Sequence, residues 1–459
     1  MLFEVFLSSP AVEAVFSPTA VVQAMMDVEA ALARAQARAG LMPATAAQAI
    51  VSLCRAELYD VPALLAAAPR AGSLAMPVVQ RLRETVALFD PSAAAYVHRS
   101  AAAQDIVDTA MVLCTREALR LIDDDLLTLC GHLLDLAERH EAVPMLGRTL
   151  MQPAQVISFR FKVMNWLMPL LRSAEMLRRQ ADAALMLQFG GPVGTLDSLG
   201  EHAEAVLEAM SQDLRLAVPD MCWHTQRDRG MRLAAEIGIM CGALGKLAQD
   251  VALMGQAEVE ELSEPQADGR GVCITLPHKH NPVAAQQAMA AVQRVPQRIA
   301  SMFSCMTPQH ERGLGQIQAE LAEWNGLLGN AHAAVQALAQ SMAAPTVRPE
   351  RMRAHVAARQ GLVASEGLEL LLLPRLGRQR TAAMLQDIIH RVRQGQGSMR
   401  EMLVQSLDQG ELPANAIAEG DLDALFDMDT SARLADQRVE SLLQDARRRC
   451  DALASRPLG

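Results

Sequence analysis

Apolar residues recur along most of the chain at the three- and four-residue spacing of an α-helix. The first clear case covers residues 18–39. Ser17 stands directly before it and can accept hydrogen bonds from free backbone N–H groups, while Pro18 suits the first helical position. Gly40 follows the last periodic residue, where glycine commonly ends a helix. The pattern therefore predicts one helix with both of its ends marked.

Further helices are expected along the middle of the chain. A long one should follow His98 and end near Pro144. Its apolar positions share one helical face: Val107, Met111, Cys114, Ala118 and Leu121. Residues 154–188 and 200–216 predict two more helices, separated by a loop at Gly190-Gly191-Pro192.

The most regular pattern covers residues 233–254. Its apolar positions alternate between spacings of four and three: Leu233, Ile237, Met240, Leu244, Leu247, Val251 and Met254. Gly238, Gly242 and Gly245 lie on the same helix. Each glycine costs about 1 kcal/mol inside a helix. Several of them together predict a close approach to neighbouring helices.

The periodic pattern stops at residues 263–282, which hold three prolines and two glycines. A loop of this length in a compact domain is often a functional lid. Helices resume at 283 and are expected to run to about 343. No stretch alternates with the two-residue period of a strand. The sequence predicts an all-α fold with three parts: an N-terminal helical domain (1–100), a central bundle of long helices (101–345) and a C-terminal helical domain (346–459).

Composition agrees with a helical interior, because 51% of residues are hydrophobic but only 3% are aromatic. The net charge of −10, without a clustered basic stripe, argues against a nucleic-acid partner. The eight cysteines are far apart and form no CxxC pair, which argues against a disulfide framework and a zinc site. No leader segment or membrane span is recognised. We expect a cytoplasmic protein.

Several segments carry a specific resemblance: VHRSAAAQDIVDT (97–109), GRTLMQPAQ (147–155), LQFGGPVGTLDSLG (187–200), WHTQRDR (223–229), GRGVCITLPHKHNPV (269–283) and HERGLG (310–315). Together they resemble the fumarase/aspartase superfamily, and within it the 3-carboxy-cis,cis-muconate cycloisomerase branch. The resemblance is strong from about residue 2 to 330 and weaker beyond.

The resemblance implies a homotetramer whose active sites are each assembled from three subunits. It implies reversible addition and elimination beside a carboxylate of a small substrate, without a metal or an organic cofactor. A base removes a proton from the carbon next to the carboxylate, and a group then leaves the neighbouring carbon. In the cycloisomerase branch that group is the substrate's own carboxylate.

Two matched segments lack groups that the family uses. The family's Thr-Ser pair is Ala102-Ala103 here, and its Gly is Ser100. The missing hydroxyls would hydrogen-bond a substrate carboxylate, and each lost bond to a charged group costs roughly 1.5–3 kcal/mol. The family's acid/base histidine after Gln152 is Pro153, which has no proton to exchange.

The loop at 263–282 also departs from its family pattern. The family's Ser-Ser, one of which acts as the base when the loop closes, is Cys273-Ile274 here. Cys273 could take over, because a thiolate forms more readily than an alkoxide and Lys279 is close in sequence. The alternative is that Cys273 is a tolerated small residue in a loop no longer used for catalysis.

The residues that match the family's anion-binding groups are largely kept. They suit carboxylates through charge-assisted hydrogen bonds: Arg148, Thr149, Gln152, Gln226, Arg227, Lys279, Asn281 and Arg312. With the family's histidine lost, His98 and His224 are the candidates for an acid. Both could instead be satisfied, partly buried histidines, and Arg227 with Asp228 could be an ordinary structural ion pair.

Two functions follow from this combination. The first is a divergent cycloisomerase or lyase that acts on a small carboxylate, with Cys273, His98 and His224 as catalytic candidates. Its pocket would be more apolar than the family's, which suits a less charged substrate. The second is a catalytically silent relative that keeps the tetrameric scaffold as a ligand-binding or protein-interaction module.

Overall fold

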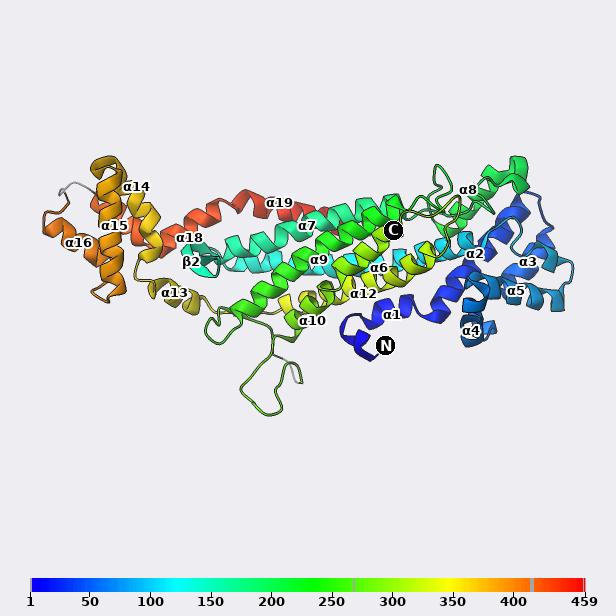
Figure 1. The fold of residues 1–459 in the computed structure, drawn as a ribbon, viewed down its shortest axis with the longest axis horizontal. Coiled ribbons are helices and arrows are strands. Elements are labelled where there is room, and N and C mark those ends of the chain that lie inside the picture. Colours follow the sequence, from blue (N-terminus) through cyan, green and yellow to red (C-terminus); the bar gives the residue numbers. More distant parts are fainter. Residues whose placement is uncertain (1, 267–268, 413–416, 457, 459) are drawn as a thin grey trace.

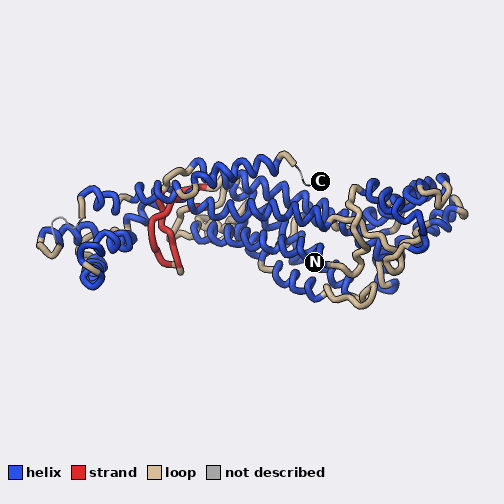
Figure 2. Tube along the Cα trace, turned by 90° about the horizontal axis from the view of Figure 1, so that it is seen from above, coloured by secondary structure: helices blue, strands red, loops and turns tan. Residues whose placement is uncertain are grey.

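The computed structural model describes residues 2–266, 269–412, 417–456 and 458. The molecule is elongated and almost entirely helical, as Figures 1 and 2 show. The all-α fold expected from the sequence is thereby confirmed. Within the described residues the strands form two small antiparallel pairs: β1 (Pro144–Thr149) with β2 (Gln152–Ser158), and β3 (Leu262–Ser263) with β4 (Thr346–Val347).

Long helices packed side by side make up the middle of the molecule (Figure 1). They are α6 (Ala103–Arg139), α7 (Phe159–Ala184), α9 (Asp228–Met254), α10 (Val283–Val292), α11 (Val295–Ser304) and α12 (Gln316–Met342). Gly238 and Gly245 of α9 lie against Ile299 and Val292, so close that an added Cβ would meet their side chains at 2.4 and 3.1 Å. The predicted close helix approach is confirmed at these two glycines but not at Gly242, where an added Cβ would meet nothing within 4 Å.

Helix α9 is also long and apolar enough to cross a membrane, judged by length and composition alone. Half of its most apolar window is buried inside the protein, and it packs against α7, α10 and α12. The core helix of a helical bundle passes the same test.

Shorter helices cover the N-terminal end of the bundle: η1 (Leu2–Phe6), α1 (Pro10–Val15), α2 (Pro18–Arg38), α3 (Ala44–Leu53), η2 (Ala56–Leu58), α4 (Val61–Ala71), α5 (Ala75–Phe89), η3 (Ala93–Tyr96), η4 (Asp197–His202) and α8 (Ala203–Leu214). The Ser17 hydroxyl accepts a hydrogen bond from the backbone N–H of Ala20 at 3.3 Å. Gly40 has a positive φ of 73° just beyond the end of α2. Both predicted helix ends are confirmed.

One stretch of secondary structure was predicted wrongly. Residues 154–158 belong to β2 instead of starting a helix, so the expectation of no strand fails for the β1–β2 hairpin. Its turn uses Leu150 and Met151 at positive φ (49° and 65°), where hairpins usually carry Asn or Gly. The burial of β2 does not alternate either, which removes the period-two signal. The helices expected between 283 and about 343 are present as α10, α11 and α12, with breaks at residues 293–294 and 305–315.

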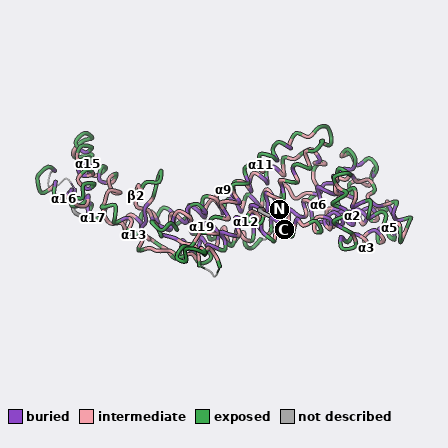
Figure 3. Tube along the Cα trace, turned by 60° about the horizontal axis from the view of Figure 1, so that its bottom comes forward, coloured by how far each residue is buried: buried purple, intermediate pink, exposed green. Residues whose placement is uncertain are grey.

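The last part of the chain is divided between two places. Helices α13 (Pro349–Ala357), η5 (Leu362–Ala364), α14 (Ser365–Leu376), α15 (Arg378–Arg393), α16 (Met399–Asp408), α17 (Glu419–Phe426) and α18 (Met428–Gln437) extend the molecule at one end. Residues there, such as Leu372, Ile388 and Leu403, form a buried cluster of their own. Helix α19 (Glu440–Ala454) returns along the bundle and packs on α6 and α7. Figure 3 shows buried segments in both parts. The three domain ranges stay a prediction.

Candidate active site

A buried carboxylate organises the start of α6. Asp105 is fully buried and accepts hydrogen bonds from the backbone N–H groups of Ala102 (2.8 Å), Gly190 (2.9 Å) and Gly191 (2.9 Å). As the third residue of the helix, it bonds the backbone N–H of Ala102 as the acid of a capping box does, and Ala102 has no side-chain oxygen to return that bond. Asp105 thus fixes the glycine turn at 190–191 against the N-terminus of α6.

His224 completes this cluster. Its Nε2 lies 2.6 Å from Oδ1 of Asp105, and its Nδ1 lies 3.1 Å from Sγ of Cys222. Burial favours the neutral ring, but the hydrogen bonds to Asp105 and Cys222 outweigh it and raise the pKa of His224 to about 9. Both ring nitrogens are engaged and only 4% of the residue is exposed, so His224 has no ring nitrogen left to bind a ligand.

His98 lies nearby in a strained backbone segment. Its Nδ1 is 2.6 Å from Oε1 of Glu29, which is 1% exposed and belongs to α2. His98 and Ser100 both have positive φ, at 60° and 65°. L-residues with side chains adopt this region at a cost. The family pattern has glycine at the position of Ser100, and the positive φ there explains this preference.

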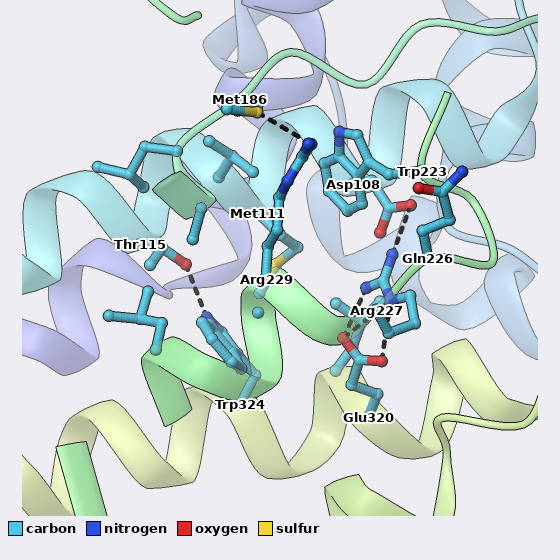
Figure 4. Close-up of a pocket in the computed structure, with 16 residues that line it drawn as sticks. Asp108, Met111, Thr115, Met186, Trp223, Gln226, Arg227, Arg229, Glu320 and Trp324 are labelled. Atoms are coloured by element: carbon cyan, nitrogen blue, oxygen red, sulfur yellow. Dashed lines mark hydrogen bonds and ion pairs between the residues drawn. The ribbon is translucent and has the colours of Figure 1, made fainter. Parts of the chain in front are cut away.

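Arg227 is committed to two buried carboxylates (Figure 4). Its guanidinium lies 3.0 Å from Asp108 and 2.6 Å from Glu320, and it stacks on the ring of Trp223. The two carboxylates outweigh the effect of burial and hold the pKa of Arg227 above its ordinary value. Burial raises the pKa of Asp108, although Arg227 opposes that shift. Asp228 lies with Arg232 instead, 3.6 Å away.

Two cavities adjoin this region. The cavity drawn in Figure 4 has a volume of about 60 Å³ and lies among Trp223, Trp324, Arg227 and Arg229. A larger cleft of about 400 Å³ lies between α2, α6, α12 and the turn before α5. Most of its lining is apolar, and its polar residues are Ser73, Gln104, Arg312 and Gln318.

Arg312 supplies the positive charge of the larger cleft. It is exposed, and its Nη2 donates to the backbone oxygen of Gly191 at 3.2 Å. Gln104 is fixed from behind, because its Nε2 donates to Asp108 and to the backbone oxygen of His224, both at 3.0 Å. Clefts of this size with a few polar groups are typical of small-molecule sites. This cleft could hold a small carboxylate against Arg312.

The β1–β2 hairpin carries a second group of the predicted residues. Arg148 donates to both oxygens of Glu261, at 3.1 and 2.8 Å, and Glu261 is fully buried. His355 of α13 also lies 2.7 Å from Glu261. Thr149 and Gln152 lie exposed at the tip of the hairpin, beside the exposed side chains of Leu150 and Met151.

The third group lies on the loop at 263–282, of which 267–268 are outside the described residues. Cys273 lies 3.5 Å from the Thr275 hydroxyl, and that hydrogen bond is the main cause that lowers the pKa of the Cys273 thiol. Backbone N–H groups and Lys279 lower it further. Lys279 is exposed, and the Asn281 N–H donates to Gly271 at 2.9 Å.

One chain does not bring these three groups together (Figure 1). The hairpin lies near the C-terminal helices, the start of α6 lies beside α2 at the other end, and the loop projects from the flank of the bundle. Sequence reasoning missed the carboxylates that hold the predicted basic residues: Glu29, Asp105, Glu261 and Glu320. Asp105 had a signal, since it stands in the matched segment 97–109, but nothing in the sequence pairs Glu261 with Arg148.

Comparisons with known proteins agree with this fold. The family model described as "Lyase" matches residues 7–297. The 3-carboxy-cis,cis-muconate cycloisomerase of Pseudomonas aeruginosa is 39% identical, over 93% of this chain and 92% of its own. Nitrosuccinate lyase of Streptomyces davaonensis is 36% identical, over 85% and 84%. The solved 3-carboxy-cis,cis-muconate lactonizing enzyme of Pseudomonas putida superimposes with a TM-score of 0.89 at 36% identity, covering 98% of this chain and 99% of that one.

Proposed function

The chain belongs to this lyase family of the fumarase/aspartase superfamily and is a lyase-type enzyme for a small carboxylate, and we propose that it catalyses addition–elimination on a substrate less charged than carboxymuconate. The cleft at the start of α6 carries the proposal. Its lining is mostly apolar, and Arg312 is its one guanidinium within the described residues. A single cation in an apolar cleft suits a substrate with one carboxylate at that position.

The complete site draws on several copies of the chain. Arg312 lines the cleft at the start of α6, whereas Cys273 lies on the loop at 263–282, which projects from the flank of the bundle (Figure 1). A reaction that uses both residues needs them at one substrate. Large apolar side chains at three loop tips support contact between copies, because Leu150, Ile274 and Leu314 are 97%, 99% and 93% exposed. We assign the assembly as a homotetramer with shared sites, working in the cytoplasm without a cofactor.

The roles within the site follow from the geometry. Arg312 binds the substrate carboxylate from the cleft, and Lys279 and Asn281 bind it from the loop of another copy. Cys273 removes the proton, which the lowered pKa of its thiol supports. His98 is the acid, held in place by Glu29. His224 is a positioning residue, since Asp105 and Cys222 take both of its ring nitrogens.

The experiment is a turnover screen of the purified full chain. Candidate substrates are succinates with a leaving group at the neighbouring carbon, together with 3-carboxy-cis,cis-muconate, and each reaction is followed by ultraviolet absorbance of the alkene. We expect the succinates, which are dicarboxylates, to turn over faster than the tricarboxylate. A preference for the tricarboxylate would contradict the proposed substrate class. The Arg312→Ala variant serves as the control that ties turnover to this cleft.

A further inference from the structure

Cys222, His224 and Asp105 form a continuous hydrogen-bonded row. Sγ of Cys222 is 3.1 Å from Nδ1 of His224, and Nε2 of that ring is 2.6 Å from Asp105. The bond to Asp105 fixes the ring with its Nε2 proton toward the carboxylate, so Nδ1 faces the sulfur. Thiols are activated by this arrangement, in which a base contacts the nucleophile and a carboxylate orients the base. The mechanism proposed above makes no use of this thiol.

The other cysteines lack this arrangement. Burial raises the pKa of six other thiols, which makes them poor nucleophiles: Cys54, Cys114, Cys130, Cys241, Cys305 and Cys450. Cys273 is bonded to a threonine instead of a histidine. Cys222 is partly exposed and packs under the glycine turn that starts at Gly190, where an added Cβ would meet Sγ at 2.4 Å.

We propose that Cys222 is a covalent modification site for small electron-poor alkenes that carry a carboxylate. Sγ forms a bond to the β-carbon of the alkene, and the π electrons move to the α-carbon. The α-carbon takes the proton that Sγ and Nδ1 of His224 shared, so one S–H adds across one C=C bond. The His224 ring is left neutral, with its Nε2 proton still toward Asp105. No oxidant or co-reactant is needed.

The carboxylate preference comes from Arg312. Its guanidinium is bonded to Gly191, the residue after the glycine that packs on Cys222. An alkene carboxylate paired with this cation would lie against the same glycine turn under which the Cys222 thiol packs. The choice of electrophile rests on the proposed function, because β-elimination beside a carboxylate releases such alkenes.

The test compares two small probes of matched size, acrylate and acrylamide, on the full chain in the Cys273→Ser background. Peptide mass spectrometry follows the rate at each remaining cysteine. We expect Cys222 to react with acrylamide about tenfold faster than Cys450 and faster than free glutathione. We also compare the rate with acrylate to the rate with acrylamide. This rate ratio should be about tenfold higher for Cys222 than for glutathione, and Arg312→Gln should bring it down to the glutathione value.

A second variant, His224→Gln, keeps a donor for Asp105 but removes the ring. It should slow the Cys222 reaction about tenfold without changing the Cys450 reaction. If this variant does not fold, the proposal is tested by comparing the acrylamide reaction rate of Cys222 in the parent protein with that of glutathione. The proposal is overturned when Cys222 reacts no faster than glutathione, or only after denaturation. Because no turnover is measured, an inactive enzyme with a reactive Cys222 would refute the proposed function alone.

Discussion

His224 and Asp105 join two distant parts of the chain through a contact of 2.6 Å between Nε2 and Oδ1. The same carboxylate holds the glycine turn at 190–191. One buried ion pair thus fixes the start of α6, the glycine turn and the segment that carries Cys222. Removing either partner would leave the other buried without its counter-charge, which is more costly than losing a surface pair.

This pair predicts a stability that depends on pH. The pKa of His224 is about 9 when folded, compared with about 6.5 when unfolded. The raised pKa of His224 therefore contributes about 3 kcal/mol to the free energy of unfolding. This contribution is fully present below pH 6.5 and is lost as the pH rises through 9. Urea denaturation at pH 6.5, 8 and 9.5 should show this loss in the parent protein. His224→Gln should show a flatter profile, and equal losses in both proteins would refute the assignment.

Ser100 predicts a stabilising substitution. Its φ of 65° is the left-handed region, where a side chain costs roughly 1–2 kcal/mol and glycine does not pay that cost. Ser100→Gly should raise the free energy of unfolding by about 0.5–1 kcal/mol, measured by chemical denaturation. The matched control is Ala118→Gly, inside α6 and fully buried, which should lower it by at least about 1 kcal/mol. A loss of stability in Ser100→Gly would show that the serine hydroxyl matters more than the strain.

The sequence predicted the helices well because their apolar spacing reports packing directly. It missed the β1–β2 hairpin, since the turn at Leu150 and Met151 has no glycine or asparagine and β2 has no alternating face. The sequence also named the basic residues of the candidate site, and their roles stay a prediction. It did not name their partners, because the pairing of Arg148 with Glu261, 113 positions apart, depends on the tertiary fold.

Cys273 provides the test of the base. Cys273→Ala should lower kcat about tenfold or more if the thiol removes the proton. The Thr275 hydroxyl is the main cause of the lowered pKa of the Cys273 thiol, so Thr275→Val should shift the acidic, rising limb of the kcat profile toward higher pH while keeping the sulfur. Cys450→Ala, distant on α19, is the control. Unchanged turnover in Cys273→Ala would remove the thiol from the mechanism.

Arg312 provides the test of the carboxylate site. Losing one charge-assisted hydrogen bond costs about 1.5–3 kcal/mol, so Arg312→Ala should lower kcat/KM by about 10- to 100-fold. Most of that loss should appear in KM, because the carboxylate is bound throughout the reaction. Arg232→Ala is a matched control, since Arg232 is exposed and pairs with Asp228 on the surface of α9. A similar effect in both variants would indicate a change of net charge rather than a binding site.

Mixing two impaired variants, assayed below KM so that both have lost most of their activity, tests whether sites are shared between copies. Cys273→Ala removes a group from the loop at 263–282, and Arg312→Ala removes one from the cleft at the start of α6. If one site takes these groups from two subunits, tetramers reassembled at random from equal amounts of both variants contain intact sites. At any one site, Cys273 is intact with a chance of one half, and so is Arg312. Both are intact in about a quarter of the sites, so activity should return to about a quarter of the parent's. The measurement is turnover after joint unfolding and refolding, with each variant refolded alone as control. If both groups came from one chain, every site would lack one of them, and no activity would return.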